Sequence, residues 1–256
     1  MSGPQAGLHA VNESHKYGGS ECLLPWETSR GVMPLPLASV VRRPVSLAVE
    51  TAAVAVGVIT AIRFLNVQSA PDLIRLLIPC LLVVAALLPT WLRKHEFPPV
   101  CMSRRDAATS LAVVSVTCLC TLPAVFLGLW LMARMRLPIP VRPVVAGPDG
   151  WLTWLTYQFL YVAVAEELFF RGYLQTNVMR CIGDAHPRGQ YVAILISAGC
   201  FALAHVVVQG QIASILTFLP GLILAWLLIR TRSLLAPILF HGLANVSYGV
   251  IALALM

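Results

Sequence analysis

Two adjacent glutamates, Glu166 and Glu167, interrupt an apolar run and are followed by Arg171. Ionisable groups inside apolar spans are costly and are candidates for a functional site. Glu167 and Arg171 lie four residues apart, so they share a helix face and are predicted to pair. Glu166 points about 100° away, with no partner three or four residues along. An unpaired, desolvated carboxylate suits proton transfer, whereas the alternative is that both glutamates mark a helix end at a membrane surface.

Two histidines and an asparagine occur in later apolar runs. His205 lies late in one run, and a lone histidine there is often a hydrogen-bonded core residue. His241 and Asn245 are four residues apart and project from one helix face, while Gly242 lets a neighbouring helix approach closely. Such a pair can donate hydrogen bonds to a developing oxyanion, or serve as an interhelical polar clamp. If the three stretches share one pocket, that pocket could activate water and stabilise an oxyanion.

The elements that must position these residues are membrane helices. Of 256 residues, 58% are hydrophobic and 11% are charged, against about 25% charged in soluble domains. The mean hydropathy is +0.81. Barrel strands would alternate polar and apolar residues, which these runs do not. The sequence therefore predicts an all-α transmembrane bundle with about seven spans, at 45–65, 73–92, 107–132, 151–172, 190–208, 212–229 and 234–254.

Three parts follow from this pattern: a mobile polar tail at 1–43, N-terminal transmembrane helices at 44–149, and a catalytic transmembrane core at 150–256. No secretory signal pattern occurs in the first 30 residues. The short breaks at 209–211 and 230–233 predict that the last three spans pack together. Glu166 and His205 can meet only if the glutamate helix continues well past Arg171, to about Met179.

The net charge of +7 is distributed at the ends of the apolar runs. This distribution excludes a nucleic-acid-binding face and is typical of the bias that orients membrane helices. It predicts a multi-pass integral membrane protein with a cytoplasmic N-terminus. The basic residues that carry the prediction are Arg42, Arg43, Arg93, Lys94, Arg104, Arg105, Arg180, Arg188, Arg230 and Arg232.

The ordered motifs resemble those of the CPBP family, the CAAX proteases and bacteriocin-processing enzymes also called Abi proteins. The family pattern is Glu-Glu-x-x-x-Arg, then Phe-x-x-x-His, then His-x-x-x-Asn or Asp. This chain has all three in order, and the resemblance covers about residues 150 to 250. It implies that Glu166 is the general base for water, assisted by His205, that His241 and Asn245 form the oxyanion site, and that Glu167 and Arg171 support them.

A metal is the alternative that the resemblance leaves open, because the family has often been described as metalloproteases. Glu166, His205 and His241 could bind Zn²⁺. However, the sequence has no His-Glu-x-x-His motif, and its seven cysteines follow no metal spacing. We therefore expect chemistry without a metal cofactor.

The expected function is that of an intramembrane endopeptidase. It would hydrolyse a peptide bond of a membrane-anchored protein or peptide near its C-terminus, by CAAX-type processing or by removal of a sorting tail, with the lipid bilayer as the surrounding partner. A non-catalytic membrane scaffold with a structural polar pocket is the first alternative. A transporter is the second, although the paired broken helices of two repeat halves are not visible in the sequence.

Overall fold

The computed structural model describes residues 44–67, 77–93, 104–136, 150–182 and 187–254. The predicted tail at 1–43 lies outside these residues. The described residues all belong to one unit of the chain, Pro36–Met256. Their regular elements are all helical, which confirms the predicted fold class.

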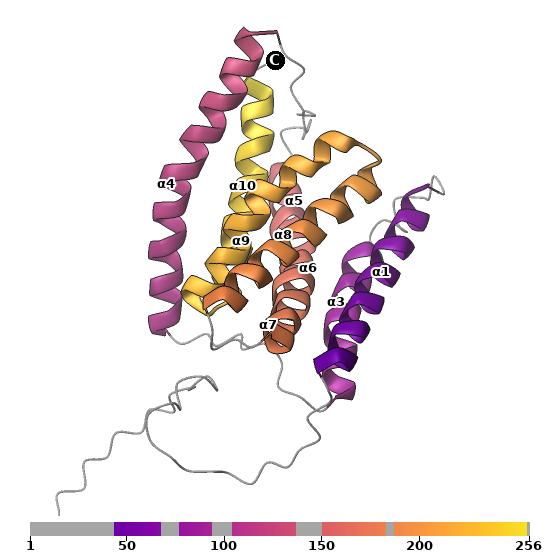
Figure 1. Cartoon of the computed structure of the whole chain (residues 1–256). Helices are drawn as coiled ribbons and strands as arrows, with labels where there is room; N and C mark the ends of the chain where they lie inside the picture. The colour runs from indigo at the N-terminus through magenta and orange to yellow at the C-terminus, as the bar shows by residue number, and fades with distance from the viewer. Residues whose placement is uncertain (1–43, 68–76, 94–103, 137–149, 183–186, 255–256) are drawn as a thin grey trace, which may run out of the picture. The chain divides into compact units, whose positions relative to one another are not determined.

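Seven helical stretches make up the described part (Figure 1). Three come first: α1 (Pro44–Val67), α3 (Leu77–Leu92) and α4 (Arg104–Arg134). A continuous helical run from Trp151 to Ile182 follows, in which π-helical and α-helical segments alternate. Its segments are α5 (Trp151–Thr156), η3 (Tyr157–Ala163), α6 (Val164–Glu167), η4 (Leu168–Gln175) and α7 (Thr176–Ile182). The chain then forms α8 (Pro187–Gln209), the 3₁₀ segment η5 (Ile212–Thr217), α9 (Phe218–Thr231) and α10 (Leu235–Ala254).

Each predicted apolar run falls on one of these stretches. Four of them are long and apolar enough to cross a membrane, namely Pro44–Leu65, Ala107–Arg134, Arg188–Gln209 and Ile212–Thr231, and Leu77–Leu92 and Leu235–Ile251 are shorter apolar helices. Residues 73–76 of the second predicted run lie outside the described residues. The fourth run was predicted to end at 172, but the helix continues to Ile182 because Gly172 is buried within it and does not break it. This extension is the one that the meeting of Glu166 and His205 requires.

The last three helices pack together, as their short connections predict. α9 contacts both α8 and α10, and α10 also contacts α4 and η3. At the α8–α9 contact, a Cβ added to Gly221 would lie 3.3 Å from the Cα of Ala198. The absence of a side chain at Gly221 therefore sets how closely these two helices approach.

A polar contact ties the first two helices to the glutamate helix. Arg93, next to the end of α3, forms a 2.7 Å ion pair with Glu50 of α1. Its guanidinium also lies 3.5 Å from the hydroxyl oxygen of Tyr173 on η4. Around this contact, α1, α3, η4 and α8 bury apolar side chains that include Leu82, Phe169 and Phe201. Glu50 is thus part of the contacts that hold these helices together.

Candidate active site

The two glutamates lie on α6, a four-residue α-helical segment between the π-helical segments η3 and η4. π-helical turns inside α-helices are frequent at functional sites. The side chain of Glu167 is fully buried, whereas that of Glu166 keeps 21% of its surface exposed. The two adjacent carboxylates therefore differ in access, which favours different roles for them.

Glu167 is paired with a buried arginine inside the bundle. Arg171 donates from Nη1 to Oε1 of Glu167 over 3.0 Å, which is the pairing predicted from their spacing. Nη2 of Arg171 donates to the backbone carbonyl of Gly221 on α9 at 3.3 Å. The guanidinium also lies 4.5 Å from the ring centroid of Phe201, close enough for a cation–π contact. Pairing and these further contacts compensate the buried charges of the Glu167 carboxylate and the Arg171 guanidinium, each of which would be costly to bury alone.

His241 of α10 lies between the two glutamates. Its Nδ1 donates to Oε1 of Glu167 over 2.7 Å. Because Nδ1 keeps its proton in this hydrogen bond, the nitrogen without a proton in the neutral ring is Nε2. Nε2 lies 3.8 Å from Oε2 of Glu166. Glu167 thus orients the imidazole and directs its second nitrogen toward Glu166.

The contact between His241 and Glu166 is too long for a direct hydrogen bond. Oε2 of Glu166 is buried, and within the described residues it has no hydrogen-bond partner. Within the described residues, the cluster therefore places a carboxylate oxygen without a hydrogen bond beside the free nitrogen of an oriented imidazole.

His205 of α8 lies beside this cluster without a hydrogen bond to it in the described part of the chain. Its Nδ1 donates to the carbonyl of Phe201 at 2.9 Å, which leaves Nε2 for other partners. The ring of Phe201 contacts both histidines, with centroid distances of 4.4 Å to His205 and 5.9 Å to His241. The Phe201 side chain therefore packs between the groups of all three sequence motifs.

Asn245 makes a contact that the sequence did not predict. Its Nδ2 donates to Oε1 of Gln158, on η3, over 3.1 Å. One turn earlier on α10, a Cβ added to Gly242 would lie 2.4 Å from the ring of Phe159, so the predicted close approach of a neighbouring helix is present. The sequence feature that could have indicated this contact is Gln158 itself, an amide side chain within the predicted apolar run 151–172.

The residues proposed as alternative metal ligands do not assemble into a metal site. Among the residues that the structure describes, no group of three or more His, Cys, Asp or Glu side chains is placed to hold a metal ion. Bonds from Nδ1 leave Nε2 free in both His205 and His241, but these two nitrogens and Glu166 do not come together as such a group. The set of Glu166, His205 and His241 therefore does not fit a bound zinc in this arrangement.

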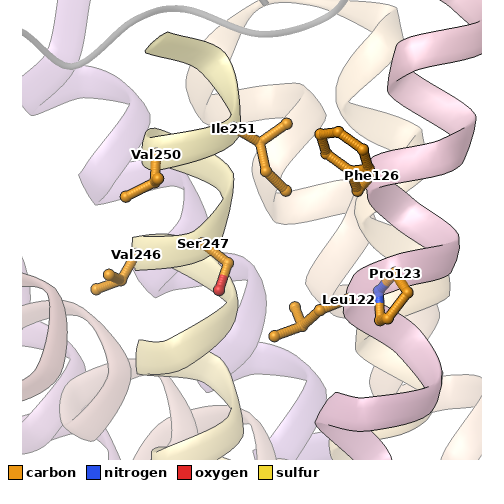
Figure 2. Close-up of a pocket in the computed structure, with 7 residues that line it drawn as sticks. All are labelled: Leu122, Pro123, Phe126, Val246, Ser247, Val250 and Ile251. Carbon is orange, nitrogen blue, oxygen red and sulfur yellow. The ribbon is translucent and has the colours of Figure 1, made fainter. Parts of the chain in front are cut away.

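Hollows on the surface of the described helices lie elsewhere and have a different character. One of about 400 Å³ lies between α4 and α10, and its lining is apolar except for Ser247 (Figure 2). A second, of about 440 Å³, lies between the same helices and reaches Phe159, the residue that packs on Gly242. Neither contains a charged side chain, so the polar cluster between α6 and α10 is the candidate for chemistry.

The part of the chain that carries the polar cluster is also the part that matches a known family. The family described as "Type II CAAX prenyl endopeptidase Rce1-like" matches residues 148–247. The family resemblance is confirmed. This Rce1-like segment, residues 148–247, contains all six predicted site residues, from Glu166 to Asn245, and covers less than half of the chain. With four helices able to cross a membrane, the chain is an integral membrane protein.

A curated protein of Escherichia coli, described as an uncharacterized 24.3 kDa protein, is 32% identical over 124 residues. The match covers 46% of this chain and 54% of that protein, so the chain spans about half the length of this relative. The relative's description names no activity. No solved structure matches the chain.

Proposed function

We propose that the chain is an intramembrane endopeptidase that uses a glutamate-activated water. The observation that carries the proposal is His241 between two carboxylates, with Nδ1 held by Glu167 at 2.7 Å and Nε2 facing Glu166 at 3.8 Å. A partly exposed carboxylate base beside an oriented imidazole is the arrangement that proton transfer during hydrolysis needs. The match of this segment to a family of prenyl endopeptidases supports the same chemistry.

In the proposed reaction, Glu166 removes a proton from a water molecule, and the water oxygen attacks the carbonyl carbon of the scissile peptide bond. The carbonyl oxygen becomes an oxyanion, which Asn245 stabilises with an N–H. His241 can donate to the oxyanion from Nε2 only as an imidazolium, which the carboxylate of Glu167 stabilises. Glu166 returns its proton to the leaving nitrogen as the C–N bond breaks. The products are a carboxylic acid and an amine.

His205 assists the base in this proposal, with Nε2 available because Nδ1 is engaged by the Phe201 carbonyl. Arg171 supports Glu167 and does not touch the reacting atoms. The substrate is a membrane-anchored protein or peptide cut near its C-terminus. A cytoplasmic N-terminus, supported by the distribution of basic residues, is part of the same proposal.

Two probes in proteoliposomes test this function. The first is a farnesylated fluorogenic peptide that ends in a Cys-a-a-X sequence. The second is a single-span reporter with a C-terminal sorting tail. We expect the purified full chain to cleave one of them at a single bond, located by mass spectrometry. If a folded, reconstituted protein cuts neither, the endopeptidase proposal is wrong and a scaffold role replaces it.

A metal-content measurement tests the chemistry without reference to the substrate. Because the two histidines and Glu166 form no metal-binding group, purified protein is expected to contain well below one equivalent of zinc by elemental analysis. Cleavage should persist with a membrane-permeant, high-affinity chelator. Stoichiometric zinc that is lost together with activity, and that restores activity when added back, would make Glu166, His205 and His241 metal ligands instead.

A further inference from the structure

We propose that Gln158 is a positioning residue that orients the carboxamide of Asn245 for the substrate's carbonyl oxygen, an inference that rests on the proposed function. The two side chains meet across the interface of η3 and α10, where Nδ2 of Asn245 donates to Oε1 of Gln158 over 3.1 Å. Both residues are half-buried. Within the described residues, neither side chain makes another hydrogen bond.

The interface around this pair is closely packed on both sides. Phe159 would lie 2.4 Å from a Cβ at Gly242, and Trp154 would lie 2.9 Å from one at Gly249. The two glycines flank Asn245 at about one turn on each side, so they hold the backbones of the two helices at a short separation. The backbone of Gln158 is consequently fixed relative to α10, so Oε1 of Gln158 can serve as an acceptor at a defined position.

The chemistry explains why Asn245 needs such an acceptor. A primary carboxamide presents two N–H donors and one oxygen, and its terminal torsion is broadly distributed unless a partner fixes it. The hydrogen bond from one N–H to Gln158 fixes the rotation of the Asn245 carboxamide. The second N–H is then directed by the same constraint and is available for an oxyanion. Asn245 lies one turn, about 6 Å along the axis, from His241, so the two side chains project from the same face of α10.

A second glutamine on the same helical run provides a structural comparison. Gln175 is fully buried and donates from Nε2 to the backbone carbonyl of Ala225 on α9 at 2.9 Å. Its bond joins two helices and touches no proposed catalytic group. Gln158, by contrast, bonds to the side chain of a proposed catalytic residue. Leucine at position 158 should therefore affect mainly the reaction rate, and leucine at position 175 mainly the stability of the fold.

The experiment compares Gln158→Leu, Gln158→Glu and Gln175→Leu with the wild type, using the probe that the wild type cleaves. Leucine removes the acceptor, so Gln158→Leu should lower kcat about ten-fold, the effect of one hydrogen bond, with KM within about two-fold. Glutamate keeps an acceptor oxygen and should restore most of kcat. Gln175→Leu should lower the melting temperature in detergent and leave kcat per folded molecule unchanged. Gln209→Leu is the control for loss of an exposed glutamine, because Gln209 at the end of α8 accepts from Ser214 over 2.6 Å and bonds to no proposed catalytic residue.

A double-mutant comparison isolates the link to Asn245. If Gln158 acts only through Asn245, adding Gln158→Leu to Asn245→Leu should cause no further loss of kcat. A lower melting temperature with unchanged kcat for Gln158→Leu would show a simple interhelical clamp and overturn the inference, while the proposed function would stand. A folded wild type that cleaves neither probe would overturn the proposed function and this inference with it.

Discussion

Glu166→Gln is expected to abolish cleavage while the protein remains folded. Glutamine keeps the shape of the side chain but cannot accept the proton of an attacking water. The contact to His241 at 3.8 Å is not a direct hydrogen bond, and Oε2 has no hydrogen-bond partner among the described residues, so little packing or bonding is lost. Loss of a general base costs about 10²- to 10⁴-fold in rate. No turnover should be detected over the background of empty proteoliposomes.

The measurement pairs cleavage of the active probe with melting temperature and elution profile in detergent. Glu50→Gln is the matched control because it makes the same change at another glutamate of an apolar helix, whose carboxylate pairs with Arg93 away from the proposed catalytic residues. Its cleavage rate per folded molecule should remain within a few-fold of the wild type. Processing by Glu166→Gln at the wild-type rate would show that Glu166 is not the base.

The sequence alone predicted a contact within one helix and the place where a neighbouring helix approaches closely. The spacing of Glu167 and Arg171 gave their pairing, because the geometry of a helical turn fixes which side chains meet. The small residue at 242 indicated a close helix contact, and Phe159 fills that place. The apolar runs located the helices because a bilayer requires spans of a certain length.

The residues that meet as partners between helices could not be predicted in the same way. A helix that is apolar all round has no hydrophobic face to reveal which side meets a neighbour. The partner of Asn245 lies 87 residues away in the sequence, and nothing local to either residue pairs them. His241 lies between two carboxylates of a helical run in which π-helical segments flank α6. Sequence periodicity of 3.6 does not show such turns.

The largest expected effect on stability is that of Arg171→Ala. The side chain is fully buried, and it bonds to Glu167 at 3.0 Å and to the Gly221 carbonyl at 3.3 Å. Removing it leaves the carboxylate of Glu167 buried without its cation. Breaking a buried ion pair from one side costs about 3–5 kcal/mol. We therefore expect a marked drop in the yield of folded protein and in melting temperature, larger than any change in the rate per folded molecule.

A second substitution separates this stabilising role from a catalytic one. In Arg171→Ala combined with Glu167→Gln, no uncompensated charge remains, while the amide oxygen at 167 can still accept from Nδ1 of His241. The double variant should therefore melt at a higher temperature than Arg171→Ala alone. Yield and melting temperature in the same detergent provide the comparison. An Arg171→Ala protein that is well expressed and thermally unaltered yet inactive would show that Arg171 acts directly in the reaction, since the lost ion pair could not then explain the loss of activity.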